Sequence, residues 1–264
     1  MSTEFLYGQS EIHIALALVG LLALAGEAGF RIGRRRRHAP AVREETQFTS
    51  IEGALLALLS LLLGFTFAMA LSRFEYRKQM VVQESNAIGT AALRAQFLPI
   101  PQQVKVGETF RRYVEIRLDA VLRTDEFSPA RQQLDVETRQ LQAQLWKIAA
   151  VAAGTDPRSV PLGLFIQAVN SLIDIKSQRD VAIANHVPES VLLLLFGFAI
   201  LAAGVLGYGN GLAGTRIRIP TTVYSIITVL VILLIIDLDR PQQGLARVSQ
   251  ESMIQLKIIL NPTK

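Results

Sequence analysis

The stretch whose side chains are best suited to a chemical role is residues 84–94, with the sequence ESNAIGTAALR. On a helix, residues three or four apart share a face, so Asn86 and Thr90 lie together and Arg94 follows one turn later. Glu84 begins this stretch, and a polar face of this kind suits the lining of an ion pore or a contact between subunits. The alternative is that Asn86 is a buried amide that hydrogen-bonds to a neighbouring helix.

Two more carboxylates, Asp174 and Asp180, lie along the helix that the sequence predicts from residue 160 to about residue 186. Across a bundle of helices, either of them can pair with Arg94 or Arg117. Such a pairing is typical of a structural network, and we therefore favour that interpretation over a catalytic or binding site for this group.

A third polar group ends the last apolar segment, where Asp237, Asp239 and Arg240 precede Pro241. Side chains two residues apart diverge on a helix, but they point the same way on an extended chain. If the helix unwinds before Pro241, both carboxylates face one cation or one arginine. We favour an ion pair or a helix-end role with Arg240, and a cation site is the alternative.

Two features of the first apolar segment have structural explanations. Glu27 is an ionisable group in a membrane segment, but Arg31 lies four residues later on the same helical face and can neutralise it. Gly29 and Gly33 have the spacing that lets helix backbones approach closely, which predicts tight packing within or between subunits. Glycines at positions 64, 197 and 204 can serve in the same way.

The sequence lacks the residues of familiar enzymes. It has no cysteine, its histidines (His13, His38 and His186) are scattered, and it contains no nucleotide-binding loop or nucleophile elbow. We therefore expect no catalytic residue, no cofactor, no metal site and no enzymatic activity. The net charge of +5 is modest, and the basic residues cluster beside a membrane segment, so nucleic-acid binding is not expected either.

These polar groups are positioned by four apolar runs, at about residues 12–30, 53–72, 191–208 and 220–236. Each run is long enough to cross a bilayer as a helix, so the lipid bilayer is a partner of this chain. We expect an all-α fold with a first transmembrane hairpin (1–74, basic loop 31–50), a soluble helical insert (75–187), a second hairpin (188–238) and a tail (239–264).

Basic residues predict the orientation of these segments in a bacterial inner membrane. Six arginines lie between residues 31 and 43, and Arg216 and Arg218 lie in the second short loop. Short basic loops stay in the cytoplasm, which places the N-terminus, the insert and the C-terminus outside, in the periplasm. The inverted layout is the alternative, because Arg73, Arg77 and Lys78 directly follow the second apolar run.

Breakers and caps divide the insert into helices. The motif at residues 49–52 (TSIE) predicts a capping box that starts the second span, and the helix then continues through residue 97. Residues 99–101 (PIP) predict a turn, and helices follow at 104–123, from Ser128 to residue 153, and at 160–186. This is an antiparallel four-helix arrangement. The sequence of the tail predicts a short amphipathic helix, which docks on the insert or lies on the lipid surface.

Several ordered segments resemble the bestrophin-like bacterial membrane proteins, a family of unknown function. They include residues 62–70, 72–77 (SRFEYR), 84–94, 98–99, 113–117 (YVEIR), 170–174, 179, 186–188 and 238–244 (LDRPQQG). The name suggests kinship to bestrophins, which are pentameric anion channels with four-span subunits and a helical domain in the cytosol. The aromatic-rich neck of a bestrophin pore is not visible in this sequence.

Two functions follow as hypotheses. The first is a homo-oligomeric channel for an inorganic ion, in which Thr66, Asn86 and Thr90 of the second span and its extension face the pore axis. Four short spans rich in small residues enclose little on their own, which favours an oligomer. The second is a non-conducting membrane scaffold or sensor, whose helical insert binds a partner.

Overall fold

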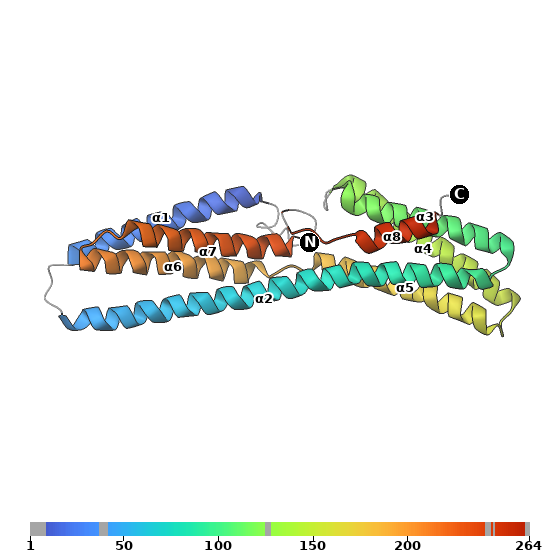
Figure 1. Cartoon of the computed structure of the whole chain (residues 1–264), viewed down its shortest axis with the longest axis horizontal. Coiled ribbons are helices and arrows are strands. Elements are labelled where there is room, and N and C mark those ends of the chain that lie inside the picture. The colour runs from blue at the N-terminus through green and yellow to red at the C-terminus, as the bar shows by residue number, and fades with distance from the viewer. Residues whose placement is uncertain (1–8, 37–41, 125–127, 241–243, 245, 262–264) are drawn as a thin grey trace. The chain divides into compact units, whose positions relative to one another are not determined.

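The chain is all-helical where the computed structural model describes it, at residues 9–36, 42–124, 128–240, 244 and 246–261. These residues form eight α-helices and one short 3-10 helix, without a strand. In chain order the elements are α1 (Glu11–Arg36), α2 (Val42–Arg94), η1 (Ala95–Phe97), α3 (Ile100–Leu122), α4 (Pro129–Thr155), α5 (Val160–Ala184), α6 (Glu189–Ala213), α7 (Arg218–Asp239) and α8 (Glu251–Leu260) (Figure 1).

Four helical segments are long and apolar enough to cross a membrane: Glu11–Arg36, Phe48–Phe97, Val160–Ala213 and Ile219–Asp239. Each contains one of the four apolar runs of the sequence, so the prediction of four spans is confirmed. The third of these segments contains two helices, α5 and α6, and Pro188 is the N-cap of α6. The third apolar run lies in α6. The protein is a membrane protein.

The chain divides into two compact units. Unit 1 contains residues 1–73 and 186–240, and therefore all four apolar runs. Unit 2 contains residues 74–185 and the tail, 241–264.

In unit 1, glycines bring α1 and α6 into backbone contact. A Cβ atom at Gly29 would lie 2.0 Å from the carbonyl oxygen of Gly204, and one at Gly207 would lie 2.0 Å from the carbonyl oxygen of Gly26. No larger residue fits at either position without separating the helices. The predicted tight packing is confirmed, and it lies within one subunit. By contrast, a Cβ atom at Gly64 or at Gly197 would meet no atom within 4 Å, so these two do not share that role in one chain.

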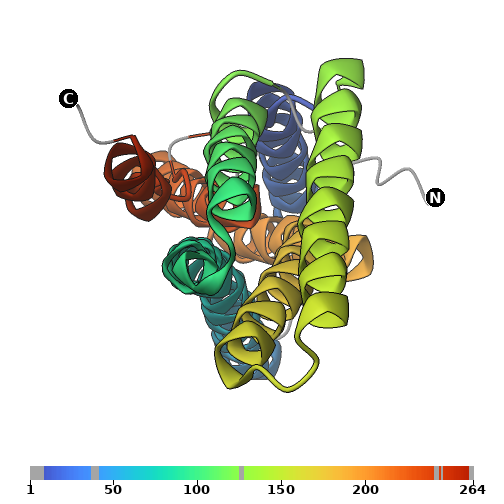
Figure 2. The same cartoon turned by 90° about the vertical axis from the view of Figure 1, so that its right-hand side faces the viewer.

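Unit 2 has its own hydrophobic core, to which α2, α3, α4, α5 and α8 all contribute. Its fully buried members include Ile88, Phe110, Leu145, Phe165 and Met253. Figure 2 shows α3 (green) beside α4 (yellow-green), and α8 (dark red) next to α3.

Helix boundaries in unit 2 follow local chemistry. The Ser128 hydroxyl accepts a hydrogen bond from the backbone N–H of Arg131, 3.2 Å away, so the predicted cap of α4 is confirmed. The predicted turn at residues 99–101 is wrong, because α3 begins at Ile100 and carries its proline in the first turn, where the missing N–H costs nothing.

The starting point predicted for the helix of the second span is also wrong. The helix begins at Val42, so residues 49–52 lie inside it and do not cap it. At its other end the prediction is confirmed, since helical backbone continues through η1 to Phe97.

The tail docks on unit 2, which resolves the two alternatives for it. Helix α8 packs against α3 and buries Met253 and Leu256, and the Ser85 hydroxyl donates a 2.9 Å hydrogen bond to the carbonyl oxygen of Ser252. Ile258 and Ile259 are largely exposed, whereas Leu260 packs against the core of unit 2.

Candidate functional site

A buried carboxylate bound by two arginines lies at the centre of unit 2. Glu84, on α2, is fully buried, and its two carboxylate oxygens are 2.8 Å from Nε and 3.2 Å from Nη2 of Arg117, on α3. Arg179 of α5 donates through Nη1 to the same carboxylate, and the Tyr113 hydroxyl donates to it over 3.1 Å. One acidic side chain therefore joins three helices.

Two glutamines extend this network to the remaining elements of unit 2. Gln142 of α4 donates through Nε2 to the Tyr113 hydroxyl oxygen, 3.4 Å away. Arg179 Nη2 donates to the side-chain oxygen of Gln250, 2.9 Å away, and Gln250 Nε2 donates to the carbonyl oxygen of Val248. The tail is thus held by a buried charged group as well as by apolar packing.

The electrostatics of the network fix its protonation state. Burial alone would raise the pKa of Glu84, but the charges and hydrogen bonds of Arg117 and Arg179 outweigh burial and lower that pKa to about 2. Burial and the adjacent Glu84 carboxylate raise the pKa of Tyr113, which stays a neutral donor. At neutral pH the group carries one negative and two positive charges.

A signal for this network exists in the sequence, although the pairing of Glu84 is not among the predictions above. Glu84 falls in a stripe of otherwise apolar residues with helical spacing, together with Val81, Ile88 and Ala91, and all four are buried. Arg117 likewise follows apolar and aromatic residues on the buried face of α3. A charged residue in an apolar stripe predicts a buried charge that needs a partner.

The polar face predicted on α2 lies in the wall of a separate groove in unit 2. This groove has a volume of about 390 Å³ and runs between α2 and α5. Its polar lining residues are Gln83, Asn86, Thr90, Arg94, Gln167 and Ser171. Asn86 and Thr90 are exposed, and Arg94 donates through Nη1 to the carbonyl oxygen of Leu164, 2.9 Å away. Asn86 is therefore not a buried amide in the single chain.

The carboxylates of α5 have local partners. Asp174 accepts a 3.1 Å hydrogen bond from the Asn170 side chain, and Asp180 pairs with Lys176. Neither of them bonds Arg94 or Arg117 directly, but the charge of Asp180 is one of the contributions that raise the pKa of Arg117, so the expected pairing is reduced to an indirect electrostatic one.

The third predicted group lies in unit 1, at the end of α7. The Asp239 carboxylate is buried, lies 2.6 Å from the backbone nitrogen of Val187 and 3.5 Å from Nδ1 of His186, and so accepts from the chain segment that enters α6. Arg73 donates to the carbonyl oxygen of His186. A carboxylate near a helix N-terminus is stabilised by the helix dipole, so Asp239 stabilises the start of α6, whereas its role with Arg240 stays a prediction.

Arg240 and Asp237 are buried at the same end of unit 1. Arg240 Nη1 lies 3.5 Å from the Glu11 carboxylate, and its Nη2 donates to the carbonyl oxygen of Gln9, 2.8 Å away. Asp237 is 5% exposed. Among the described residues, no group of three His, Cys, Asp or Glu side chains is arranged to hold a metal ion.

Thr66 lies apart from all of these groups, in the unit 1 part of α2. It is buried by this chain, and its hydroxyl donates to the carbonyl oxygen of Leu62, 2.8 Å away. The predicted residues therefore fall into five places: the buried network, the groove, an exposed face of α5 (Asp174), the charged end of unit 1 and a helix interior.

Comparison with known proteins identifies the class of molecule that this fold represents. The model of the bestrophin-like domain matches residues 20–253, and the chain therefore belongs to the bestrophin-like family. The family resemblance seen in the sequence is confirmed. No curated protein matches the sequence.

Solved structures of a bacterial bestrophin homologue from Klebsiella pneumoniae share the fold. The structure phased by Zn-SAD has a TM-score of 0.63 at 15% identity and covers 95% of this chain and 97% of that one. A single-substitution variant of that homologue has a TM-score of 0.66 at 14% identity, with 97% and 100% covered. At such identities the likeness concerns the fold alone.

Proposed function

We propose that this protein is a homo-oligomeric ion channel, and that the groove between α2 and α5 faces the ion path. The observation that carries this proposal is the exposure of Asn86 and Thr90 in the single chain, on a wall that also contains Arg94. Membership of the bestrophin-like family and the four apolar spans support it.

The lining of the groove suits a small ion that has lost part of its hydration shell. Amide and hydroxyl groups can replace water around an ion, as pore-lining groups do in channels. Arg94 is the charged residue among those that line the groove, which favours an anion over a cation. Thr66 is not included in this proposal, because its side chain is buried and bonded to its own helix.

The buried network supports the groove from behind. Glu84 and Asn86 are two residues apart on α2 and point to different sides of it, one buried and one exposed. Since Glu84 binds Arg179 of α5, the ion pair fixes the spacing between the two helices whose outer faces form the groove. Rigid support of this kind keeps a polar lining in register with a passing ion.

Ion flux into liposomes tests the proposal directly, and the absence of native cysteine makes the test specific. A single Asn86→Cys variant carries one thiol, which a charged thiol reagent modifies. We expect the purified, reconstituted protein to conduct chloride, and modification at position 86 to reduce that flux. The matched control is Gln140→Cys on α4, an exposed position outside the groove, where modification leaves flux unchanged.

The outcomes separate the two hypotheses of function. Absence of flux for every small ion tested, across pH and voltage, would reject the channel and favour the scaffold or sensor. Flux that both modified variants retain would keep the channel but place its path elsewhere. Potassium selectivity would reject the role proposed for Arg94.

We propose in addition that the protein lies in a bacterial inner membrane with unit 2 outside the cytoplasm. Support comes from unit 1, where Arg216 of the second short loop and Arg31 at the start of the first both bind Glu27 of α1, so basic residues of the two short loops meet at one carboxylate. A reporter fused after Lys264 that is active only in the cytoplasm should stay inactive. An active reporter would establish the inverted layout.

A further inference from the structure

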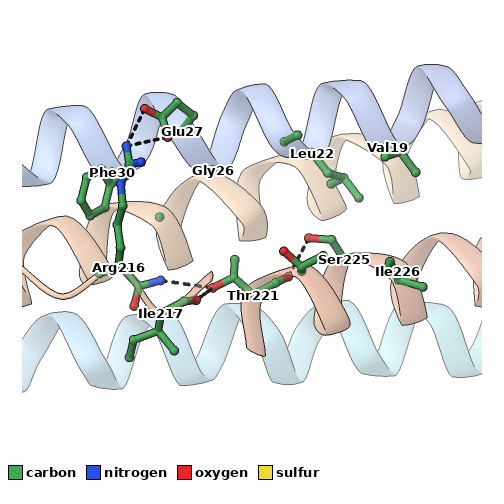
Figure 3. Close-up of a pocket in the computed structure, with 14 residues that line it drawn as sticks. Val19, Leu22, Gly26, Glu27, Phe30, Arg216, Ile217, Thr221, Ser225 and Ile226 are labelled. Atoms are coloured by element: carbon green, nitrogen blue, oxygen red, sulfur yellow. Dashed lines mark hydrogen bonds and ion pairs between the residues drawn. The ribbon is translucent and has the colours of Figure 1, made fainter. Parts of the chain in front are cut away.

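Unit 1 contains a groove that the proposed ion path does not use. It lies between α1, α6 and α7, includes residues of the loop before α7, and has a volume of about 410 Å³ (Figure 3). This volume falls within the range of about 300–1,000 Å³ that is usual for ligand sites. All three helices contain membrane-spanning segments, so a molecule in the groove comes from the bilayer or from its surface.

One end of the groove is charged. Arg216 Nη2 lies 2.9 and 3.0 Å from the two carboxylate oxygens of Glu27, and its guanidinium lies 4.5 Å from the centre of the Phe30 ring. Both bonds use a single nitrogen, so Nε and Nη1 of Arg216 have no partner among the described residues. The ion pair and the ring therefore hold a guanidinium in place with donors left for a ligand.

The other end of the groove is apolar. Figure 3 shows Val19, Leu22 and Ile226 at the end opposite to Glu27 and Arg216. Between the ends, the Thr221 and Ser225 hydroxyls donate to the carbonyl oxygens of Ile217 and Thr221, and the Asn210 side chain donates to the Thr221 hydroxyl oxygen over 3.3 Å, so the middle of the groove is polar and uncharged. Val19 and Ile226 are 45% and 48% exposed, which leaves this end open at the side of the helices.

The charge around the polar end is positive. Arg31 also binds Glu27, at 2.8 Å, and Arg34, Arg35 and Arg36 follow in the last turn of α1. One carboxylate is thus surrounded by arginines, and the excess charge favours an anionic group. A phosphate fits the free N–H donors of Arg216, because guanidinium groups match the geometry of phosphate oxygens. A cation would have to bind Glu27, which already has two arginine partners.

We propose that this groove binds an anionic phospholipid. Its phosphate lies against Arg216, and one acyl chain follows Val19, Leu22 and Ile226 along the apolar end. The charged end of the groove matches the phosphate of a phospholipid, and the apolar end matches its acyl chain. The two ends of the groove therefore have the same order as the two parts of the lipid. It is independent of ion conduction.

Native mass spectrometry of the full chain in detergent tests the proposal. We expect one phosphatidylglycerol per chain to be retained in preference to phosphatidylcholine with the same acyl chains. Arg216→Gln should lower this retention about tenfold, as loss of a charge-assisted hydrogen bond does. The matched control is Arg35→Gln, which removes the same charge from the end of α1 but does not line the groove, and it should leave retention unchanged.

A second pair of variants tests the apolar end. Ala23→Phe and Ile226→Trp both fill the groove with bulk, and each should displace the lipid while the protein stays monodisperse and thermally stable. Equal losses in the two arginine variants would show general surface attraction and overturn the proposal. Retention unaffected by filling would also overturn it, and so would displacement of the lipid by free glycerol phosphate, which would identify a site for soluble phosphate.

Discussion

Two glutamates of this protein have the same chemical partners in opposite surroundings. Glu27 in unit 1 and Glu84 in unit 2 are each bound by two arginines, and in each case the Nε atom of one arginine (Arg31 or Arg117) lies 2.8 Å from the carboxylate. The Glu27 side chain is 39% exposed, whereas the Glu84 side chain is 0% exposed. The comparison separates what ion pairing contributes from what burial contributes.

Burial changes the free-energy cost of losing the carboxylate more than it changes the distances within the ion pair. An exposed carboxylate exchanges an arginine for water with little change in free energy. When the buried carboxylate is removed, its arginines stay out of reach of water, and only Arg117 keeps an acidic neighbour, Asp135 at 3.9 Å. We therefore expect Glu84 to be a determinant of the stability of unit 2, and Glu27 to contribute mainly to the charge of the groove beside it.

The largest expected effect is that of Glu84→Gln. It leaves Arg117 and Arg179 buried with no carboxylate between them, which costs about 3–5 kcal/mol. The single tryptophan, Trp146, lies in α4 of unit 2, so its fluorescence during chemical unfolding measures the change. Glu115→Gln, at a partly exposed position on α3, is the control. Equal stability of the two variants would contradict the role assigned to Glu84.

The second prediction concerns pH. The pKa of Glu84 is about 2 in the folded protein, against an ordinary value of 4.5. A lowered pKa stabilises the fold above the ordinary value, and this stabilisation, about 3 kcal/mol, is lost as pH falls from about 4.5 to 2. The difference in unfolding free energy between the natural chain and Glu84→Gln should therefore shrink across that window. A difference that stays constant down to about pH 2 would show that the fold does not lower the pKa of Glu84.

The third prediction is that packing matters more than charge where Glu27 lies. Gly207→Ala places a Cβ atom 2.0 Å from the carbonyl oxygen of Gly26, so α1 and α6 must separate, at a cost of about 1–3 kcal/mol. Gly20→Ala has nothing within 4 Å and should be neutral or slightly stabilising, because alanine favours helix. Calorimetry in detergent compares the two variants, and a similar loss in both would mean that helix contact is not the cause.

The sequence predicts these two carboxylate groups unequally. Glu27 and Arg31 are four residues apart on one helix, so their pair can be predicted from spacing alone, and it is confirmed. Glu84 lies 33 residues from Arg117 and 95 from Arg179, and only tertiary packing brings them together. Helical periodicity gives the face of each residue but not the neighbouring helix that it meets, which is why the direct partners of Asp174 and Asp180, Asn170 and Lys176 on the same helix, are not among the predictions.

Six of the nine segments that carry the family resemblance contribute residues to two places of the fold. Residues 84–94, 113–117 and 179 contain Glu84, Tyr113, Arg117 and Arg179, which form the buried network. Residues 72–77, 186–188 and 238–244 contain Arg73, His186, Val187 and Asp239 at the charged end of unit 1. Segments scattered along the chain are thus the parts of two buried charged groups. Spacing in the sequence does not show this, because the groups form only when the helices pack.

The smallest expected effect is that of Glu27→Gln on stability. Its side chain is partly exposed, and both arginines can turn to solvent or to lipid headgroups, so the melting temperature in lipid-free detergent should not change measurably. Retention of an anionic phospholipid should instead rise, because Arg216 loses its carboxylate partner and the groove becomes more positive. A drop in melting temperature as large as that of Glu84→Gln would show that burial does not distinguish the two groups. Unchanged stability with increased lipid retention would establish different roles for the two groups. Glu84 and its arginines would maintain the fold of unit 2, whereas Glu27 and its arginines would set the charge of the groove in unit 1.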